Sequence, residues 1–158
     1  MQWTTLGTAK VGQYGEYAMK MALARLGCEI YVPEIDDHGV DLLFRRAGSP
    51  FGEVQVKSAT SLNYRFVTKE KFAPRERFFY GLVLLLSDEE PECFLIPSLA
   101  WNAGKLHPLL KSRDYIGGKS KPEFGIDLAR NNALELLDEF RLTDATLSAW
   151  LTSSETAR

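Results

Sequence analysis

The segment Gly52-Glu53-Val54-Gln55-Val56-Lys57-Ser58 alternates polar and apolar side chains with a period of two. This alternation predicts a β-strand with one face against an apolar core. Glu53, Gln55 and Lys57 lie together on the opposite face, because residues two apart in a strand point the same way. One face of the strand therefore carries a carboxylate, an amide and an ammonium group.

The residues before this strand predict a helix and two further strands. Residues 8–27 carry apolar and small side chains at helical spacing, with Thr8 as the expected N-cap and Gly27 as the stop. Residues 29–33 and 40–46 have the composition of strands, and a turn-forming Asp-Asp-His-Gly cluster separates them. Three strands joined by short turns predict an antiparallel meander.

The residues after the strand predict a buried strand followed by smaller elements. Residues 79–86 are continuously apolar and are expected at the centre of the sheet. The other expected elements are a short helix within 69–77, a strand at 92–97, a short helix at 98–103, a basic loop at 105–122, an edge strand at 123–128, and helices at 131–140 and 144–151, the last capped by Thr143. We expect one domain over residues 1–151 and a flexible tail at 152–158.

The composition is that of an ordinary globular domain. The chain has 158 residues, of which 45% are hydrophobic and 25% are charged. No apolar run approaches the ~18 residues of a membrane span, so no membrane association is expected. Cys28 and Cys93 form no Cys-x-x-Cys pattern, so a reducing, cytoplasmic setting is expected. The formal net charge is −2, so any binding of nucleic acid must come from local patches.

Four polar residues suggest a site that handles phosphate. Glu16 lies on the predicted helix, Asp41 lies at the start of the second strand, and Gln55 and Lys57 share a face of the third. Oxygen ligands from adjacent strands can hold a hard cation such as Mg²⁺ or Mn²⁺. A lysine beside such a cation can orient the attacking water and offset charge developing on a phosphate.

The stretches at residues 12–17 (GQYGEY), 39–43 (GVDLL) and 54–58 (VQVKS) resemble the PD-(D/E)XK nuclease superfamily, which has the restriction-endonuclease-like fold. The pattern is most similar to small archaeal Holliday-junction resolvases, and the resemblance covers roughly residues 10–97. It implies an α/β fold with a mixed β-sheet flanked by helices, built on an α-β-β-β-α-β core. The chain would add helices at its C-terminal end.

The resemblance also implies a role for each matching residue. Asp41 corresponds to the metal-binding aspartate, Lys57 to the catalytic lysine, and Glu16 to the helix glutamate that assists metal or water binding. The backbone carbonyl of Val56 would be a further metal ligand. Gln55 departs from the pattern, because this position usually holds Asp or Glu.

The glutamine has a physical consequence for metal binding. Its side-chain oxygen can coordinate a cation, but it removes one negative charge from the site. A unit charge a few ångströms from a dication is worth several kcal/mol even at an effective dielectric constant of ~20. We therefore expect weaker metal affinity unless Glu16 or Glu53 compensates.

Two basic stretches are candidates for contact with DNA. Residues 57–77 hold six Lys or Arg against two acids, and residues 105–121 hold five against one, so each has a net charge of +4. The candidate phosphate contacts are Ser58, Arg65, Lys69, Lys71 and Arg75, and Tyr64, Phe66 and Phe72 are interleaved with them. The plainer alternative is that both stretches are solvated loops.

These observations predict a metal-dependent endonuclease that hydrolyses phosphodiester bonds of DNA. A homodimer would suit cleavage of both strands. One alternative is a nuclease-fold module that binds DNA with weak or no catalysis. Another is an interaction subunit of a repair, restriction or defence complex. Taken alone, Glu16 is also explained by a surface ion pair with Lys20 at i+4.

Overall fold

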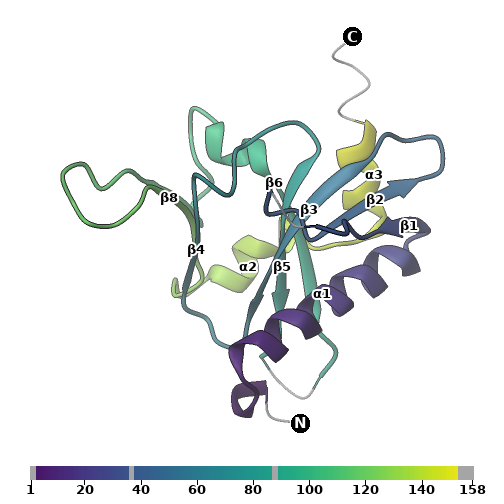
Figure 1. Cartoon of the computed structure of the whole chain (residues 1–158), viewed down its shortest axis with the longest axis horizontal. Helices are drawn as coiled ribbons and strands as arrows, with labels where there is room; N and C mark the ends of the chain where they lie inside the picture. Colours follow the sequence, from purple (N-terminus) through teal and green to yellow (C-terminus); the bar gives the residue numbers. More distant parts are fainter. Residues whose placement is uncertain (1–2, 36–37, 87–88, 153–158) are drawn as a thin grey trace.

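The computed structural model describes residues 3–35, 38–86 and 89–152. Helix α1 (Thr8–Arg25) lies against a five-stranded sheet of order β1-β2-β3-β5-β6, and a separate three-stranded sheet has the order β4-β8-β7 (Figure 1). The strands of the first sheet are β1 (Cys28–Tyr31), β2 (Leu42–Arg46), β3 (Gly52–Ala59), β5 (Phe78–Leu84) and β6 (Glu92–Pro97). Those of the second are β4 (Tyr64–Thr68), β7 (Leu110–Arg113) and β8 (Glu123–Asp127). The remaining helices are α2 (Ala133–Leu137), α3 (Asp144–Thr152) and short 3₁₀ helices at Trp3–Thr5, Ser98–Asn102 and Asp138–Phe140.

The five-stranded sheet is mixed. The pairs β1–β2, β2–β3 and β5–β6 are antiparallel, whereas β3 and β5 run parallel. The fold is therefore α/β with a mixed sheet flanked by helices, and the expected meander of the first three strands is confirmed. Strand β3 occupies the centre of the sheet, where β5 had been expected, and all seven residues of β5 are buried next to it.

Side-chain alternation along β3 separates two hydrophobic cores. Val54 and Val56 pack with Met19 and Leu23 of α1 on one face. Ala59 packs on the other face in the core that fills the space between the two sheets. Glu53, Gln55 and Lys57 alternate with the valines, so they project from the face turned towards the three-stranded sheet.

Helix α1 reaches the sheet closely because Gly15 has no side chain. A Cβ at Gly15 would lie 1.8 Å from the Ser58 Oγ and 3.1 Å from the Ser58 Cβ. The helix ends as expected, since Leu26 is the C-cap and Gly27 follows with φ +81°. The N-cap is Gly7 rather than Thr8, and no side chain caps this end.

Several expectations for the second half of the chain are wrong. The crossover from β3 to β5 contains strand β4 rather than a helix, and no helix forms within residues 69–77, all of which are described. The expected basic loop at 105–122 contains strand β7. The cap of α3 is confirmed, because the Thr146 N–H donates to the Thr143 Oγ1 at 3.2 Å. The tail predicted at 152–158 falls almost wholly outside the described residues.

Helices near the C-terminal end of the chain also contact the sheets. Arg46 of β2 donates to the Asp144 carboxylate of α3 at 2.8 Å. Phe140 belongs to the core between the sheets. Within the described residues, no helix has both the length and the apolar character needed to cross a membrane.

Candidate active site

Asp41 connects the start of β2 to the middle of β3. Its N–H donates to the Val54 carbonyl at 2.9 Å, and its carboxylate Oδ2 accepts the Val56 N–H at 2.6 Å. The N–H and C=O of one strand residue point to the same side. The Val56 carbonyl therefore lies on the edge of β3 where the Asp41 carboxylate sits, so two oxygen donors share this edge.

Gln55 is buried beside Asp41. Leu42 pairs with Val54, so continuing the register places Asp41 opposite Gln55. The Gln55 side chain is only 4% exposed, and its Oε1 has no hydrogen-bond partner among the described residues. A buried polar atom without a partner costs about 1–3 kcal/mol, so this oxygen is suited to a ligand that would satisfy it.

A glycine allows the backbone to pass close to Gln55. Gly39 has φ +70°, a conformation that side chains disfavour. A Cβ at Gly39 would lie 2.9 Å from the Gln55 Nε2 and 2.9 Å from the Lys71 carbonyl oxygen. The Gly-x-Asp of the sequence thus allows a close backbone approach at Gly39, which brings the Asp41 backbone against β3.

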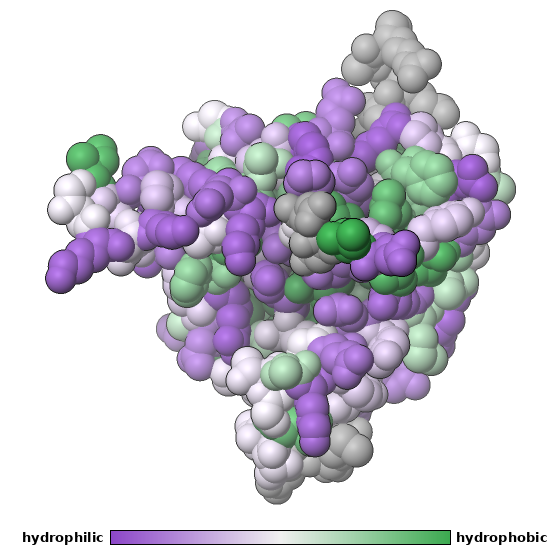
Figure 2. Space-filling model, in the orientation of Figure 1, coloured by the Kyte–Doolittle hydropathy of each residue, from purple (hydrophilic) through white to green (hydrophobic). Residues whose placement is uncertain are grey.

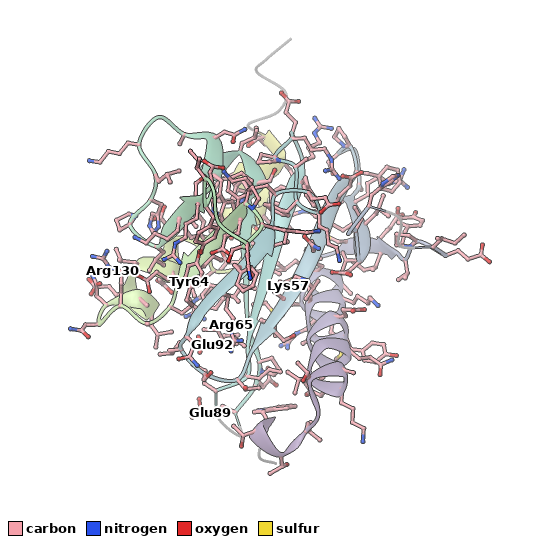
Figure 3. All side chains as sticks on the ribbon, turned by 60° about the vertical axis from the view of Figure 1, so that its left-hand side comes forward. Lys57, Tyr64, Arg65, Glu89, Glu92 and Arg130 are labelled. Atoms are coloured by element: carbon pink, nitrogen blue, oxygen red, sulfur yellow. The ribbon has the colours of Figure 1, made fainter. Side chains whose placement is uncertain are left out.

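Lys57 shares the face of Gln55 and is half-buried. Lys57 is labelled in Figure 3, together with Tyr64 and Arg65 of β4. Next to Gln55 and Lys57 lies Tyr80, which is the register partner of Gln55 on β5 and was not singled out from the sequence. Burial raises the pKa of Tyr80, although the nearby Arg65 acts in the opposite direction. The Tyr80 hydroxyl has no hydrogen-bond partner among the described residues. A lone tyrosine within the apolar run FFYGLVLLL was the available signal.

Glu53 is held by an ion pair on the same face. The Arg75 Nε donates to its carboxylate at 2.9 Å, and the Arg75 Nη2 makes a second, shorter bond. Any role for Glu53 as a replacement metal ligand would have to compete with this guanidinium. Arg75, a candidate DNA contact, is therefore also part of the support of β3.

Glu16 approaches β3 from the other side of the sheet. It lies next to Gly15, which contacts Ser58, and its carboxylate is 3.9 Å from the Lys20 Nζ. The i+4 ion pair considered from the sequence is thus present. Helix α1 covers the Val54 and Val56 face, whereas Lys57 projects from the opposite face.

The candidate DNA contacts have different surroundings. The Ser58 Oγ is buried against α1, so the structure turns it away from the surface. The Lys69 Nζ donates to the Asp114 Oδ1 at 2.7 Å and to the Ser112 Oγ at 2.8 Å. Arg65 donates to the Ser61 Oγ at 3.3 Å.

A cavity of about 470 Å³ lies beside the close backbone approach at Gly39. Its lining includes Val40, Glu53, Arg75 and the exposed Lys71, together with His38. Val40 directly precedes Asp41, so the cavity is adjacent to the candidate site. Lys71 and Arg75, both predicted DNA contacts, line this opening.

The donor set fits a hard cation but is poor in charge. Among residues 3–35, 38–86 and 89–152, no three His, Cys, Asp or Glu side chains gather as a metal cluster. The oxygens that do come together are the Asp41 carboxylate and the Val56 carbonyl, with the partnerless Gln55 Oε1 alongside. Carboxylate, amide and carbonyl oxygens suit Mg²⁺ or Mn²⁺, and a single carboxylate favours weak binding.

The architecture resembles that of two solved nucleases. The first is Hjc, a Holliday junction resolvase from Archaeoglobus fulgidus: the TM-score is 0.54 at 12% identity, over 87% of this chain and 95% of that chain. The second is the bacterial homing endonuclease I-Ssp6803I: the TM-score is 0.52 at 17% identity, over 96% of this chain and 99% of that chain. No protein-family model and no curated protein matches the sequence. The similarity to these two nucleases is therefore a similarity of fold.

Proposed function

We propose that this chain is a metal-dependent endonuclease that hydrolyses phosphodiester bonds of DNA. The observation that carries this proposal is the meeting of Asp41 with β3, where its carboxylate accepts the Val56 N–H at 2.6 Å beside the partnerless Gln55 Oε1. The resemblance in fold to two nucleases supports it. Lys57, on the same face of β3 as Gln55, is the last residue of the proposed catalytic group.

Each residue has a distinct role in the proposed reaction. Asp41, Gln55 and the Val56 carbonyl would hold Mg²⁺ or Mn²⁺, whereas Glu16 lies on the α1 side of the sheet beside Lys20 and is given no ligand role. When bound, the cation would polarise the scissile phosphate and lower the pKa of a coordinated water. The Lys57 ammonium would position the attacking water and stabilise negative charge that develops on the phosphate. Gly39 keeps the Asp41 backbone against β3.

The direct test is cleavage by the purified chain. Linear, nicked and branched DNA would be incubated with Mg²⁺ or Mn²⁺, and products would be separated on denaturing gels. We expect cleavage by the unaltered protein and a loss of at least about 100-fold in rate for Asp41→Ala and Lys57→Ala, since each removes charge stabilisation of the transition state.

Two controls keep this test specific. Lys10→Ala removes an exposed lysine of α1 and should cleave at the unaltered rate. Thermal melting should show that Lys57→Ala remains folded. Intact DNA with both cations on every substrate, or full activity in both Asp41→Ala and Lys57→Ala, would refute the proposal.

A second candidate function is a nuclease-fold module that binds DNA without cutting it, alone or as an interaction subunit. The lack of a metal cluster of three acidic, His or Cys side chains in the described parts of the chain favours it. Titration with Mn²⁺ separates the two functions. DNA binding without any cation binding would support the module, whereas saturable cation binding that Asp41→Ala abolishes would support the enzyme.

Two further features complete the proposal. Cleavage of both strands would use a symmetric homodimer, which sedimentation of the protein with and without DNA would detect. A reducing, cytoplasmic setting suits the chain, because Cys28 and Cys93 are both free and buried. Burial raises the pKa of the Cys93 thiol to about 12, so this thiol is poorly reactive at neutral pH.

A further inference from the structure

The two basic stretches of the sequence meet in the three-stranded sheet. Strand β4 comes from the first stretch and β7 from the second, and β8 pairs with both of them. The inner face of this sheet contributes Val67, Phe124 and Ile126 to the core. The outer face carries Tyr64 and Phe66 of β4 and Lys111 and Arg113 of β7, which alternate with the core residues in register.

Tyr64 and Phe66 place two stacked aromatic rings on this outer face, and we call this pair the aromatic platform. Their rings are nearly parallel, at 19°, with centroids 6.4 Å apart. Phe66 pairs in register with Gly125, and a Cβ at Gly125 would lie 2.0 Å from the Tyr64 hydroxyl. The Tyr64 ring therefore lies across the glycine. Phe66 is 55% exposed, so an apolar ring is open to solvent.

A buried carboxylate fixes the platform in place. Glu123 Oε1 accepts the hydroxyls of Tyr64 at 2.8 Å and of Tyr115 at 2.9 Å. The Arg113 guanidinium lies 4.4 Å from the Tyr64 ring centroid and 3.8 Å from the same carboxylate. Desolvation, followed by Glu123, raises the pKa of Tyr64, which keeps its hydroxyl a donor. Tyr115 reaches Glu123 from a left-handed backbone conformation with φ 48°.

Positive charge borders the platform on its β7 side. Arg113 and Lys111 lie on the same face. The loop between β7 and β8 adds the exposed Lys119, whereas Lys121 forms an ion pair with Glu70 at 2.9 Å. In Figure 1 this loop projects from the body of the molecule, and Figure 2 shows mostly hydrophilic residues over it. An open aromatic ring bordered by cations matches the chemistry of a nucleobase joined to phosphates.

We propose that the aromatic platform binds an unpaired nucleotide of a DNA strand, with the base stacked on Phe66 and its phosphates held by Arg113 and Lys111. A base within a duplex offers only its edges in the grooves, whereas an unpaired base offers a face that can stack. The proposal rests on the proposed function insofar as it names DNA as the ligand. It adds that the preferred DNA contains a single-stranded segment.

The test measures binding without cleavage. Fluorescence anisotropy in excess EDTA would use labelled oligo-deoxythymidine, the same strand with abasic sites, and a duplex. Base stacking on an aromatic side chain is worth enough that its loss weakens binding about 10-fold. We expect Phe66→Ala to weaken binding of oligo-deoxythymidine by about 10-fold and to leave the abasic strand and the duplex unchanged.

Matched variants make the result specific. Phe66→Trp should retain binding, because it keeps a stacking ring. Tyr17→Ala removes an aromatic ring of α1 that is also 55% exposed and should change nothing. The proposal is overturned by three results: no binding of the single strand by the unaltered protein, unchanged binding by Phe66→Ala, or an equal loss on the abasic strand.

Failure of this proposal and failure of the nuclease are distinguishable. Binding in EDTA requires no Mg²⁺ and no cleavage, so a protein that never cuts DNA can still pass this test. A protein that cuts DNA while Phe66→Ala binds the single strand normally refutes the platform and leaves the nuclease intact.

Discussion

In the proposed metal site, Gln55 is the donor at which a carboxylate would add a negative charge. It places a neutral, buried amide oxygen beside the Asp41 carboxylate. We predict that Gln55→Glu increases affinity for Mg²⁺ by at least about 10-fold, since one more negative charge near a dication is worth several kcal/mol even at a high effective dielectric constant. Isothermal calorimetry with Mg²⁺ and Mn²⁺ would measure the change.

In the metal-free protein, the same substitution should lower thermal stability at neutral and higher pH. A buried carboxylate has its pKa raised by desolvation, so its contribution is favourable at low pH and is lost as pH rises through that pKa. Thermal melting without metal should therefore show a lower Tm at pH 8 than at pH 5 relative to the unaltered protein. Gln55→Met is the control without charge. Equal Mg²⁺ affinity in Gln55→Glu and the unaltered protein would remove Gln55 from the metal site.

Residue-level inference from the sequence was strongest where strand periodicity applied. The alternation in residues 52–58 correctly gave the shared face of Gln55 and Lys57. It also implies that Ser58 points the other way, towards α1, where its Oγ is buried. Phe72 was considered with the platform aromatics, yet it is fully buried, because the turn that carries it folds inward between the sheets. Periodicity cannot describe such a turn.

At the scale of elements, the close packing of α1 on β3 depends on Gly15. We predict that Gly15→Ala lowers the free energy of unfolding by about 1–3 kcal/mol, because the added methyl group would meet the Ser58 side chain. Urea denaturation would measure this change. The same change in a Ser58→Gly background should be neutral or stabilising, which would assign the cost to that contact.

A second glycine of the same helix provides the control for this prediction. Nothing lies within 4 Å of a Cβ at Gly12. Gly12→Ala should therefore raise the free energy of unfolding by about 0.5–1 kcal/mol through helix propensity alone. Equal effects of the two substitutions would contradict the packing role of Gly15.

Elements with strong local signals were predicted, whereas the short strands β4 and β7 were not. Helix α1 and strands β1–β3 have caps, turns and periodicity within a few residues of themselves. Strand β7 is a four-residue LKSR segment, and it forms because β8 pairs with it in register from Leu110 to Arg113. Strand β4 pairs with β8, about 60 residues away in the sequence. Strand formation in the polar LKSR segment is therefore set by its partner.

At the scale of the whole molecule, Phe72 joins the two sheets. Its ring centroid lies 4.6 Å from that of Phe78 and 5.8 Å from that of Tyr80 in the five-stranded sheet. It also lies 6.4 Å from Phe124 in the three-stranded sheet and 5.5 Å from Trp101. The Trp101 Nε1 donates to the Gly125 carbonyl at 3.2 Å. This hydrogen bond is a second contact that holds β8 beneath the Tyr64 ring of the aromatic platform.

We predict that Phe72→Ala lowers the free energy of unfolding by about 3–5 kcal/mol, because it leaves a cavity among these rings. Far-UV circular dichroism would follow the backbone, and fluorescence in a Trp3→Phe, Trp150→Phe background, which keeps Trp101 alone, would follow the surroundings of Trp101 during urea denaturation. Both signals should shift together to lower urea, since one core holds the two sheets. Phe51→Ala, at an aromatic residue that is 42% exposed, should change stability by much less. A fluorescence transition well before the loss of circular dichroism would contradict the prediction, because the sheet that carries the aromatic platform would then unfold separately from the sheet that carries Asp41 and Lys57.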